Sequence, residues 1–180
     1  MLNVVKIFIR DFSYIFSNYF IANIPSWFLR RLLYRMLGMK IGKGSRISMK
    51  CIVMSPWKIR IGNNTMVNEY VLLDGRGELV IGDNTSISMW SIIYTASHVS
   101  NSDTFEYYSK KTIIGNCCWV GTRAIVMPGS TVNDGTIISV NSSIKGTTEV
   151  NSIYSGNPAK KIRNREIMSY YALNNQNFMK

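Results

Sequence analysis

The sequence is poor in the residues that build metal sites and disulfide frameworks. It contains a single histidine and three cysteines, Cys51, Cys117 and Cys118, in 180 residues. The cysteines form no C-x-x-C pair, and an odd number that includes two adjacent residues makes a poor disulfide framework. We therefore predict buried, reduced thiols, with a reactive thiol as the alternative. We expect no metal site, since one histidine without paired thiols is a poor zinc ligand set.

Acidic residues and long apolar runs are also scarce. The sequence has ten Asp and Glu residues against 21 Lys and Arg residues, which gives a formal net charge of +11. Such an excess suits an anionic partner: nucleic acid, a phosphorylated cofactor or an acidic membrane surface. No uncharged apolar run reaches the length of about 18 residues that a membrane-spanning helix needs. Lys6, Arg10 and Asp11 interrupt the apolar N-terminal stretch and no cleavage site follows, so we expect no secretory signal and a cytoplasmic location.

What the sequence has in abundance is an interval of six between aliphatic residues. The longest series is Ile114, Val120, Val126, Val132, Ile138, Ile144 and Val150. Three upstream blocks are Ile41, Ile47, Val53, Ile59, then Ile61, Val67, Leu73, Leu79, then Ile81, Ile87, Ile93, Val99. This interval fits neither the helical period of about 3.6 residues nor strand alternation, so it indicates a structural repeat.

The block lengths indicate a triangular coil. Three hexapeptides make one turn of a parallel β-helix, with one aliphatic side chain per hexapeptide pointing into the prism. Blocks begin at 41, 61 and 81, and later at 114, 132 and 150, so turns of 20 residues give way to turns of 18. The two extra residues fall around Pro56-Trp57 and Gly75-Arg76-Gly77, and a longer insertion at about 94–113 falls at the same corner. We predict about five coils over 41–157; an evenly spaced β-sandwich is the alternative.

Segments outside the coils are predicted to close its ends. Residues 1–40 form a helical cap, with a first helix over 1–22 and a second over 26–37. The polar stripe of the first helix is Asn3, Lys6, Arg10, Ser13 and Ser17. This segment covers the first coil; the alternative, which is compatible with it, is that residues 1–37 hold the protein on an anionic bilayer surface through aromatic and basic side chains. Residues 158–180 are predicted to be a C-terminal tail with a short helix.

His98 is the candidate catalytic residue. It opens the long insertion YTASHVSNSDTFEYYSKKT, which projects from a rigid scaffold. Long loops on rigid scaffolds tend to carry function, and histidine accepts protons near neutral pH as a general base must. A lone histidine is otherwise usually structural or merely solvated. Asp74, Asp103 and Glu106 are candidates to orient it or to bind an acceptor, and a backbone carbonyl is the alternative orienting group.

Several segments resemble one known family. IGNCCWVG, IVMPGSTV and YSGNPAKKIR resemble the closing coils of the hexapeptide-repeat acyltransferases, and IGDNTSIS…YTASH resembles their histidine-bearing coil. The pattern is most similar to the galactoside and maltose O-acetyltransferases and to those that modify bacterial surface polysaccharides. The resemblance covers roughly residues 30–165. It implies a left-handed winding of the all-β parallel helix and a homotrimer, with acetyl-CoA in the cleft between neighbouring prisms.

The resemblance also implies roles for single residues. His98 would be the general base, Trp119 would line the cleft beside the pantetheine arm, and Gly121 and Thr122 would lie near the thioester. The other implied cofactor-binding residues are Val140, Ser142, Lys145, Pro158, Lys160, Ile162 and Arg163. The predicted acceptor-binding residues are Trp90, Asp74 and Tyr107. Alternatively, Trp119 packs between subunits, and the basic C-terminal residues are only solvated charges.

Trp90 marks a departure from the family pattern. Galactoside-type relatives place an asparagine on this coil to hold the acceptor sugar, whereas an aromatic ring favours stacking on a sugar face. This difference argues against a simple monosaccharide acceptor.

The resemblance implies direct transfer of an acetyl group from acetyl-CoA to a sugar hydroxyl in a cell-surface polysaccharide or its precursor. His98 would take the hydroxyl proton, and a backbone N–H would stabilise the oxyanion. Two alternatives stay open: an N-acetyltransferase acting on an amino-sugar or antibiotic-like acceptor, and a non-catalytic β-helix scaffold. Nucleic-acid binding is not expected, because the basic residues are scattered over both ends of the chain.

Overall fold

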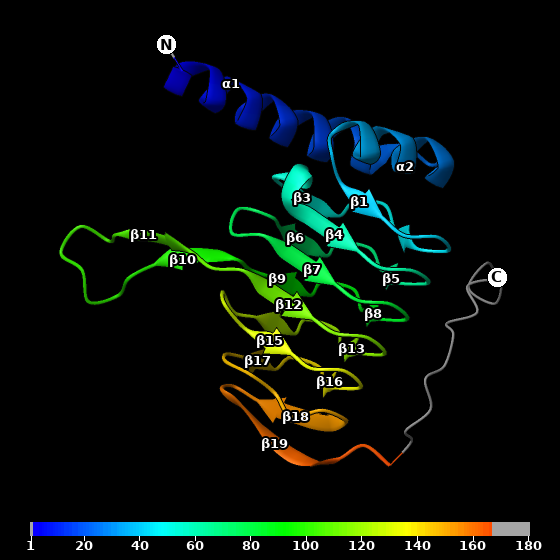
Figure 1. The fold of residues 1–180 in the computed structure, drawn as a ribbon, viewed down its shortest axis with the longest axis vertical. Helices are drawn as coiled ribbons and strands as arrows, with labels where there is room; N and C mark the ends of the chain where they lie inside the picture. The colour runs from blue at the N-terminus through cyan, green and yellow to red at the C-terminus, as the bar shows by residue number, and fades with distance from the viewer. Residues whose placement is uncertain (1, 167–180) are drawn as a thin grey trace.

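The computed structural model describes residues 2–166 as a triangular prism of short strands beneath a helical cap (Figure 1). Each face of the prism is one sheet. The first sheet holds β1 (Lys40–Ile41), β4 (Ile59–Ile61), β7 (Leu79–Ile81), β12 (Thr112–Ile114) and β15 (Thr131–Val132). The second holds β2 (Arg46–Ile47), β5 (Met66–Val67), β8 (Ser86–Ile87), β13 (Trp119–Val120), β16 (Ile137–Ile138), β18 (Ser152–Gly156) and β19 (Ala159–Asn164). The third holds β3 (Ile52–Met54), β6 (Leu72–Asp74), β9 (Ile92–Ile93), β14 (Ile125–Val126) and β17 (Ser143–Ile144).

The interval of six is confirmed as the register of the prism. In the first sheet Ile61 pairs with Ile41 on one side and Ile81 on the other, and the chain of partners continues through Ile114 to Val132. All five side chains are buried. The strands complete five full turns, and β18 adds part of a sixth. One apolar column per face therefore fills the interior, and stacked strands satisfy one another's backbone groups.

Two aliphatics of the predicted series do not point inward, so this part of the prediction is wrong. Val99 is 38% exposed because it lies in the insertion, and Val150 is 60% exposed. The last turn is two residues shorter than the one before it: Val120 pairs with Ile138, but Ile138 pairs with Tyr154. This shortening moves residue 150 out to a corner.

The recurring Ile-Gly-Asn and Ile-Gly-Asp tripeptides are explained by a side-chain ladder. The Oδ1 atom of Asp83 accepts the Asn63 N–H at 2.6 Å, and Asn116 Oδ1 accepts the Asp83 N–H at 2.8 Å. Asp134 Oδ1 accepts from Asn116 in the same way at 2.7 Å. Each polar side chain thus satisfies a corner N–H of the preceding turn, which strand pairing leaves free.

The three cysteines are buried and unbridged, as predicted. Cys118 belongs to a column of buried hydroxyls that includes Thr85 and Thr136, and its thiol donates to the Asn133 carbonyl. Burial raises the pKa of Cys51 and of Cys118 to about 12. At neutral pH both are therefore protonated thiols and poor nucleophiles.

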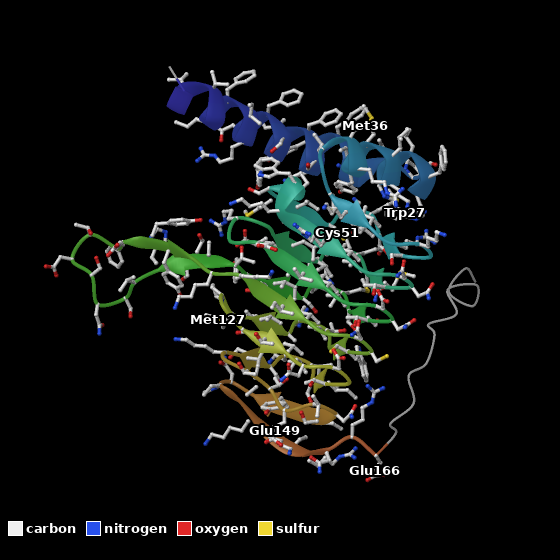
Figure 2. All side chains as sticks on the ribbon, in the orientation of Figure 1. Trp27, Met36, Cys51, Met127, Glu149 and Glu166 are labelled. Atoms are coloured by element: carbon white, nitrogen blue, oxygen red, sulfur yellow. The ribbon has the colours of Figure 1, made fainter. Side chains whose placement is uncertain are left out.

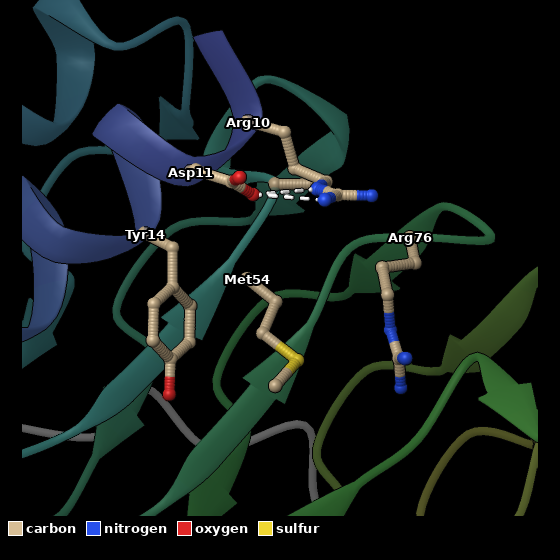
Figure 3. Close-up of a pocket in the computed structure, with 6 residues that line it drawn as sticks. Arg10, Asp11, Tyr14, Met54 and Arg76 are labelled. Carbon is tan, nitrogen blue, oxygen red and sulfur yellow. Dashed lines mark hydrogen bonds and ion pairs between the residues drawn. The ribbon is translucent and has the colours of Figure 1, made fainter. Parts of the chain in front are cut away.

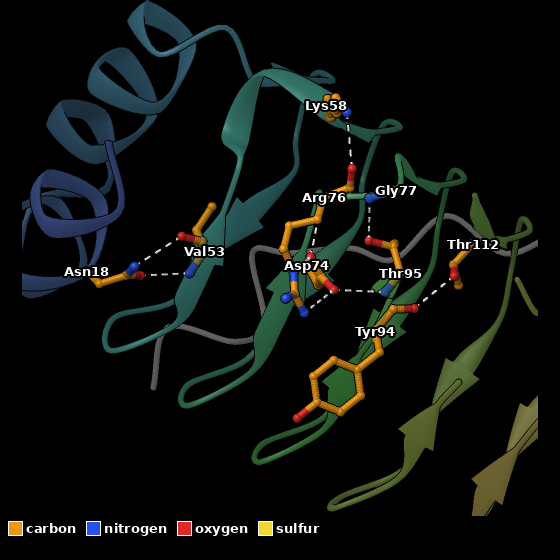
Figure 4. A network of polar contacts seen from close by, with 9 residues as sticks. All are labelled: Asn18, Val53, Lys58, Asp74, Arg76, Gly77, Tyr94, Thr95 and Thr112. Carbon is orange, nitrogen blue, oxygen red and sulfur yellow. Dashed lines mark hydrogen bonds and ion pairs between the residues drawn. The ribbon is translucent and has the colours of Figure 1, made fainter. Parts of the chain in front are cut away.

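The N-terminal segment caps the first coil as predicted, but it is not one continuous helix. Helix α1 (Leu2–Ile15) passes into a π-helical turn (Phe16–Phe20) and a 3-10 turn (Ile21–Asn23), and α2 (Trp27–Met36) follows. The side chain of Asn18 accepts from the Val53 N–H at 2.7 Å and donates to its carbonyl at 3.1 Å (Figure 4). It thereby pairs with the exposed edge of β3 as a further strand would. No helix within residues 2–166 has the length and apolarity to span a bilayer.

The C-terminal tail predicted from residue 158 begins as a strand. β19 pairs antiparallel with β18 and turns back over the last coil. The remainder of the predicted tail helix, residues 167–180, lies outside the part that the structure describes, as do the side chains of Asn3 and Lys6.

Candidate active site

The predicted insertion is a β-hairpin that projects from one corner of the prism (Figure 1). It consists of β10 (Ala96–His98) and β11 (Tyr107–Ser109), and it connects the third sheet to the first. The turn at Gly75–Gly77 occupies the same corner one coil away, and the 3-10 turn Pro56–Lys58 occupies it two coils away. The prediction that all three insertions share one corner is confirmed.

A backbone carbonyl orients His98. The His98 Nδ1 atom lies 2.5 Å from the carbonyl oxygen of Phe105. A carbonyl oxygen only accepts hydrogen bonds, so Nδ1 carries the proton and Nε2 keeps a free lone pair. The ring is exposed and contacts the edge of Tyr107, its partner across the hairpin, with 5.9 Å between ring centroids. This tautomer is the one that a general base acting through Nε2 requires.

The tip of the hairpin is shaped to present that carbonyl. Phe105 has a left-handed backbone conformation, with φ of +49°. The hydroxyl of Ser102 accepts the N–H of Glu106 at 3.2 Å, and the Phe105 N–H donates to the Ser102 carbonyl at 3.2 Å. Neither Ser102 nor Phe105 was recognised from the sequence, because the turn they form depends on backbone angles that carry no glycine or proline signal.

A buried carboxylate ties down the base of the hairpin (Figure 4). Asp74 is fully buried, and its two oxygens accept from the Arg76 guanidinium at 2.9 and 3.0 Å. It also accepts the backbone N–H of Arg76 at 2.9 Å and that of Thr95, which immediately precedes β10, at 3.0 Å. Burial by itself raises the pKa of Asp74, but these hydrogen bonds from Arg76 and Thr95 outweigh it and lower the pKa overall. Within one chain both oxygens of Asp74 are thus occupied by hydrogen bonds from Arg76 and Thr95, and neither is available to bind an acceptor sugar.

Two exposed aromatic residues lie away from the hairpin. The Trp90 ring stacks on Tyr70 with centroids 4.2 Å apart and planes within 3°, at the corner between the second and third sheets. Trp119 stands on the second sheet, and its Nε1–H donates to the Ser88 hydroxyl at 2.9 Å. In a triangular prism the second sheet is the face opposite the hairpin corner. A single chain therefore keeps Trp119 and His98 on opposite sides.

The stacking of Tyr70 on Trp90 was not predicted from the sequence, although the spacing of the two residues indicates it. The first coils are 20 residues long, and Tyr70 precedes Trp90 by one such coil. The same arithmetic that placed the aliphatic columns would have placed the two rings in register.

The residues predicted to bind the cofactor occupy the lower coils. Gly121 and Thr122 lie one coil away from the segment that holds Val140 and Ser142: the Gly121 N–H donates to the Ile138 carbonyl, and the Asn141 N–H donates to that of Thr122. A Cβ atom at Gly121 would lie 2.7 Å from the Val140 nitrogen, so this close approach requires glycine. Ser142 is buried, and its hydroxyl accepts the Gly156 N–H at 3.0 Å.

The residues of the C-terminal segment that were predicted to bind the cofactor are exposed. Pro158, Lys160, Ile162 and Arg163 are exposed in and beside β19, and Lys145 is exposed after β17. This segment also forms ion pairs: Arg163 Nη1 is 3.5 Å from Glu166 Oε1, and Nζ of the neighbouring Lys161 is 2.6 Å from Glu149 Oε2. Within residues 2–166, no three His, Cys, Asp or Glu side chains are grouped to hold a metal ion.

Comparison with known proteins decides the family. No protein-family profile matches the chain. The Escherichia coli protein named "Putative colanic acid biosynthesis acetyltransferase WcaF" is 37% identical over 136 residues, which cover 76% of this chain and 75% of that relative. The chain belongs to the hexapeptide-repeat acetyltransferases.

Solved structures agree with this assignment at the level of the fold. A hexapeptide-repeat acetyltransferase from Vibrio cholerae superposes with a TM-score of 0.81 at 24% identity, covering 88% of this chain and 92% of that one. The Vibrio protein has also been solved with acetyl-coenzyme A. A maltose O-acetyltransferase from Clostridium difficile gives a TM-score of 0.81 at 23% identity, over 91% and 89% of the two chains. The left-handed winding expected of a hexapeptide-repeat acetyltransferase is thereby confirmed.

Proposed function

We propose that this hexapeptide-repeat acetyltransferase transfers an acetyl group from acetyl-CoA directly to a sugar hydroxyl in a cell-surface polysaccharide or its precursor, with His98 as the general base. The observation that carries the proposal is the His98 tautomer: Nδ1 donates to the Phe105 carbonyl, which leaves Nε2 free to take a proton. The relative named for colanic acid biosynthesis supports the choice of a polysaccharide precursor.

The proposed reaction moves one proton and one acyl group. Nε2 of His98 takes the proton of the acceptor hydroxyl as its oxygen attacks the thioester carbonyl. A backbone N–H stabilises the tetrahedral oxyanion. The C–S bond then breaks, and the imidazolium returns its proton to the departing sulfur. The buried, protonated thiols of Cys51 and Cys118 are not suited to form an acyl-enzyme, which favours direct transfer.

The site is proposed to be completed in a homotrimer. His98 and Trp119 lie on opposite sides of one prism, so a neighbouring prism is needed to bring a hairpin against a second sheet. Acetyl-CoA would then lie along that seam, with Trp119, Gly121, Thr122, Val140 and Ser142 lining it. The exposed side chains of Lys145, Pro158, Lys160, Ile162 and Arg163 would meet its nucleotide and phosphates.

The acceptor sugar is proposed to use the stacked pair of Trp90 and Tyr70. The Trp90 indole is half-exposed and its orientation is fixed by stacking on Tyr70, so it can stack on the apolar face of a sugar. Beside it lies a hollow of about 220 Å³ whose polar lining, Arg46, Ser48, Asn68 and Glu69, offers donors and acceptors for hydroxyl groups.

The bond that the enzyme forms provides the test. Purified protein incubated with acetyl-CoA and polysaccharide-precursor sugars is expected to give a product heavier by one acetyl group, as detected by mass spectrometry. Mild alkali should remove that group, because an ester is labile there and an amide is not. An alkali-stable product would identify an N-acetyltransferase, and the absence of both CoA binding and product would leave a non-catalytic scaffold.

We also propose that α1 attaches the enzyme peripherally to a membrane surface. Phe8, Phe12, Phe16 and Phe20 stack in one row, with centroids 6.4, 5.7 and 5.2 Å apart. Phe8 is 69% exposed and Phe12 55%, and Figure 2 shows ring side chains on the helix face that points away from the prism. An exposed apolar row on a protein of net charge +11 suits an anionic bilayer.

Replacement of both Phe8 and Phe12 by serine is expected to reduce binding to anionic lipid vesicles by at least about tenfold. The reason is that the bilayer would no longer bury these two aromatic side chains, which are exposed on the protein alone. Co-sedimentation with vesicles measures it. Val150→Ser, which removes an exposed apolar residue at the far end of the prism, is the matched control and should leave sedimentation unchanged. Equal sedimentation of the double variant and the unmodified protein would contradict membrane attachment through α1.

A further inference from the structure

A groove separates helix α1 from the corner that carries the hairpin. It is lined by Arg10, Asp11 and Tyr14 of α1 and by Met54, Ser55 and Arg76 of the coils (Figure 3). Its volume is about 230 Å³. In Figure 3 the Tyr14 ring, the Met54 thioether and the Arg76 guanidinium all point into the same space. Only Arg76 entered the description of the candidate active site, as the ion-pair partner of Asp74 at the base of the hairpin.

A second hollow lies at the same corner and reaches the hairpin. It has a volume of about 280 Å³ and shares Arg76 with the first. Its other lining residues are Trp57, Lys58, Arg60, Gly77, Glu78 and Ser109. Ser109 lies in β11, the strand that pairs with the His98 strand. Arg76 thus lies between the helix and the hairpin and lines both hollows.

Cations outnumber anions around the two hollows. Arg10, Lys58, Arg60 and Arg76 line them, and the acidic lining residues are Asp11 and Glu78. The buried Asp74 carboxylate is hydrogen-bonded to Arg76. Glu78 is already paired with Lys111, with 3.0 Å between Nζ and Oε1. The positive charge is therefore only partly balanced by the protein itself, which suits an anionic ligand.

Both arginines are placed to contact such a ligand. Arg76 is held in place through Nε and Nη2 by Asp74, yet its side chain is 35% exposed. The hydrogen bonds that Arg76 donates to Asp74, together with the nearby phenols of Tyr107 and Tyr94, raise the pKa of Arg76, so it keeps its charge. The Arg10–Asp11 pair joins adjacent, exposed residues, and pairs of that kind contribute little stability. Arg10 can therefore turn toward a phosphate, which a guanidinium binds in a bidentate manner.

Three surfaces follow one another at this end of the molecule. The phenylalanine row of α1 is apolar. The groove beneath it holds the Arg10 and Arg76 guanidiniums, with Tyr14 and Met54 as its apolar wall, and the hairpin with His98 comes next. A ligand that matched this order would have a hydrocarbon chain, then a phosphate or diphosphate, then a sugar.

We propose that the groove between α1 and Arg76 binds the phosphate or diphosphate of a lipid-linked sugar, and so presents the sugar of an amphiphilic acceptor to the hairpin. The inference rests on the proposed acetyl transfer, since it names the class of acceptor. It assigns Arg10 and Arg76 to the anion and Tyr14 and Met54 to the first part of the hydrocarbon chain.

Calorimetric titration of the full-length protein with three probes tests the proposal: geranyl diphosphate, inorganic diphosphate and geraniol. Geranyl diphosphate is expected to bind most tightly of the three. Arg10→Gln should weaken its binding at least about tenfold, as expected for the loss of one hydrogen bond between charged groups. Lys43→Gln, which removes an exposed cation at another corner, is the matched control and should bind as the unmodified protein does.

Unchanged affinity in Arg10→Gln, or no saturable binding of geranyl diphosphate, would overturn the proposal. Equal binding of inorganic diphosphate would show a free-anion site, and equal binding of geraniol would show an apolar pocket; either result also overturns it. Arg10 is exposed, so the variant should keep the melting temperature of the unmodified protein. The titration uses no acetyl-CoA, so its failure would leave the alkali-labile acetyl test intact, and failure of that test would not alter these affinities.

Discussion

Replacement of His98 by alanine is expected to lower kcat for acetyl transfer by about 10²–10⁴-fold, the usual contribution of a general base. The loss follows from the removal of Nε2, the atom left free when Nδ1 donates to the Phe105 carbonyl. The prism should be unaffected, because His98 lies on an exposed hairpin outside the buried aliphatic columns. Steady-state kinetics with acetyl-CoA in excess measures kcat, and a thermal unfolding curve measures the stability of the prism.

Two further variants separate proton transfer from hairpin geometry. His98→Asn can still donate to the Phe105 carbonyl through its amide but has no base, so it should lose as much activity as His98→Ala. Asp103→Ala removes an exposed carboxylate of the same loop and should keep activity within about twofold, since a carbonyl and not a carboxylate orients the ring. Retention of more than about a tenth of kcat in both His98 variants would exclude His98 as the base.

Replacement of Asp74 by alanine is expected to destabilise the protein by roughly 2–4 kcal/mol. The carboxylate is fully buried and accepts from the Arg76 guanidinium and from the N–H groups of Arg76 and Thr95. Its removal leaves the Thr95 N–H buried without this partner, while the part-exposed Arg76 is relieved by solvent, which keeps the loss below that of a fully buried ion pair. Urea unfolding followed by circular dichroism gives the free energy of unfolding.

The exposed pair at the same corner provides the control. Glu78→Gln breaks the contact with Lys111 on the surface and should change the urea midpoint little. If Asp74→Ala unfolded at the same urea concentration as Glu78→Gln, the network of Asp74, Arg76 and Thr95 would not be what holds the base of the hairpin.

The contribution of Asp74 is also expected to depend on pH. Its pKa in the folded protein lies below its ordinary value of 3.8. The ionised form is thus stabilised by folding: the contribution is complete above that ordinary value and is lost as pH falls through the lower, folded-state pKa. The difference in stability between the unmodified protein and Asp74→Asn should therefore shrink as acid is added below about pH 4. A difference that grew on acidification would contradict a lowered pKa.

The order of amino acids by itself determined the prism. Ile61 falls beside Ile81, and Val120 beside Ile138, because one aliphatic every six residues can be buried only if each group of three hexapeptides closes a triangle. The coil length also put the extra residues of the first three turns at one corner, and with them the hairpin that carries His98. The prediction that Val150 points into the prism failed, because no residue near it in the sequence indicates that the last turn is two residues shorter than the one before it.

Only the tertiary structure decided which atoms serve the candidate site. Asp74, Asp103 and Glu106 were indistinguishable as partners of His98 from the sequence, and the ring is held by the carbonyl of Phe105, a group that every residue carries and no pattern marks. The direction of that carbonyl depends on the left-handed angles at Phe105, and the groove at Arg76 depends on a helix some sixty residues earlier in the chain. Periodicity specifies which side chains are buried, because burial repeats with the backbone; it does not specify contacts between a loop, a helix and a corner that meet only once in the fold.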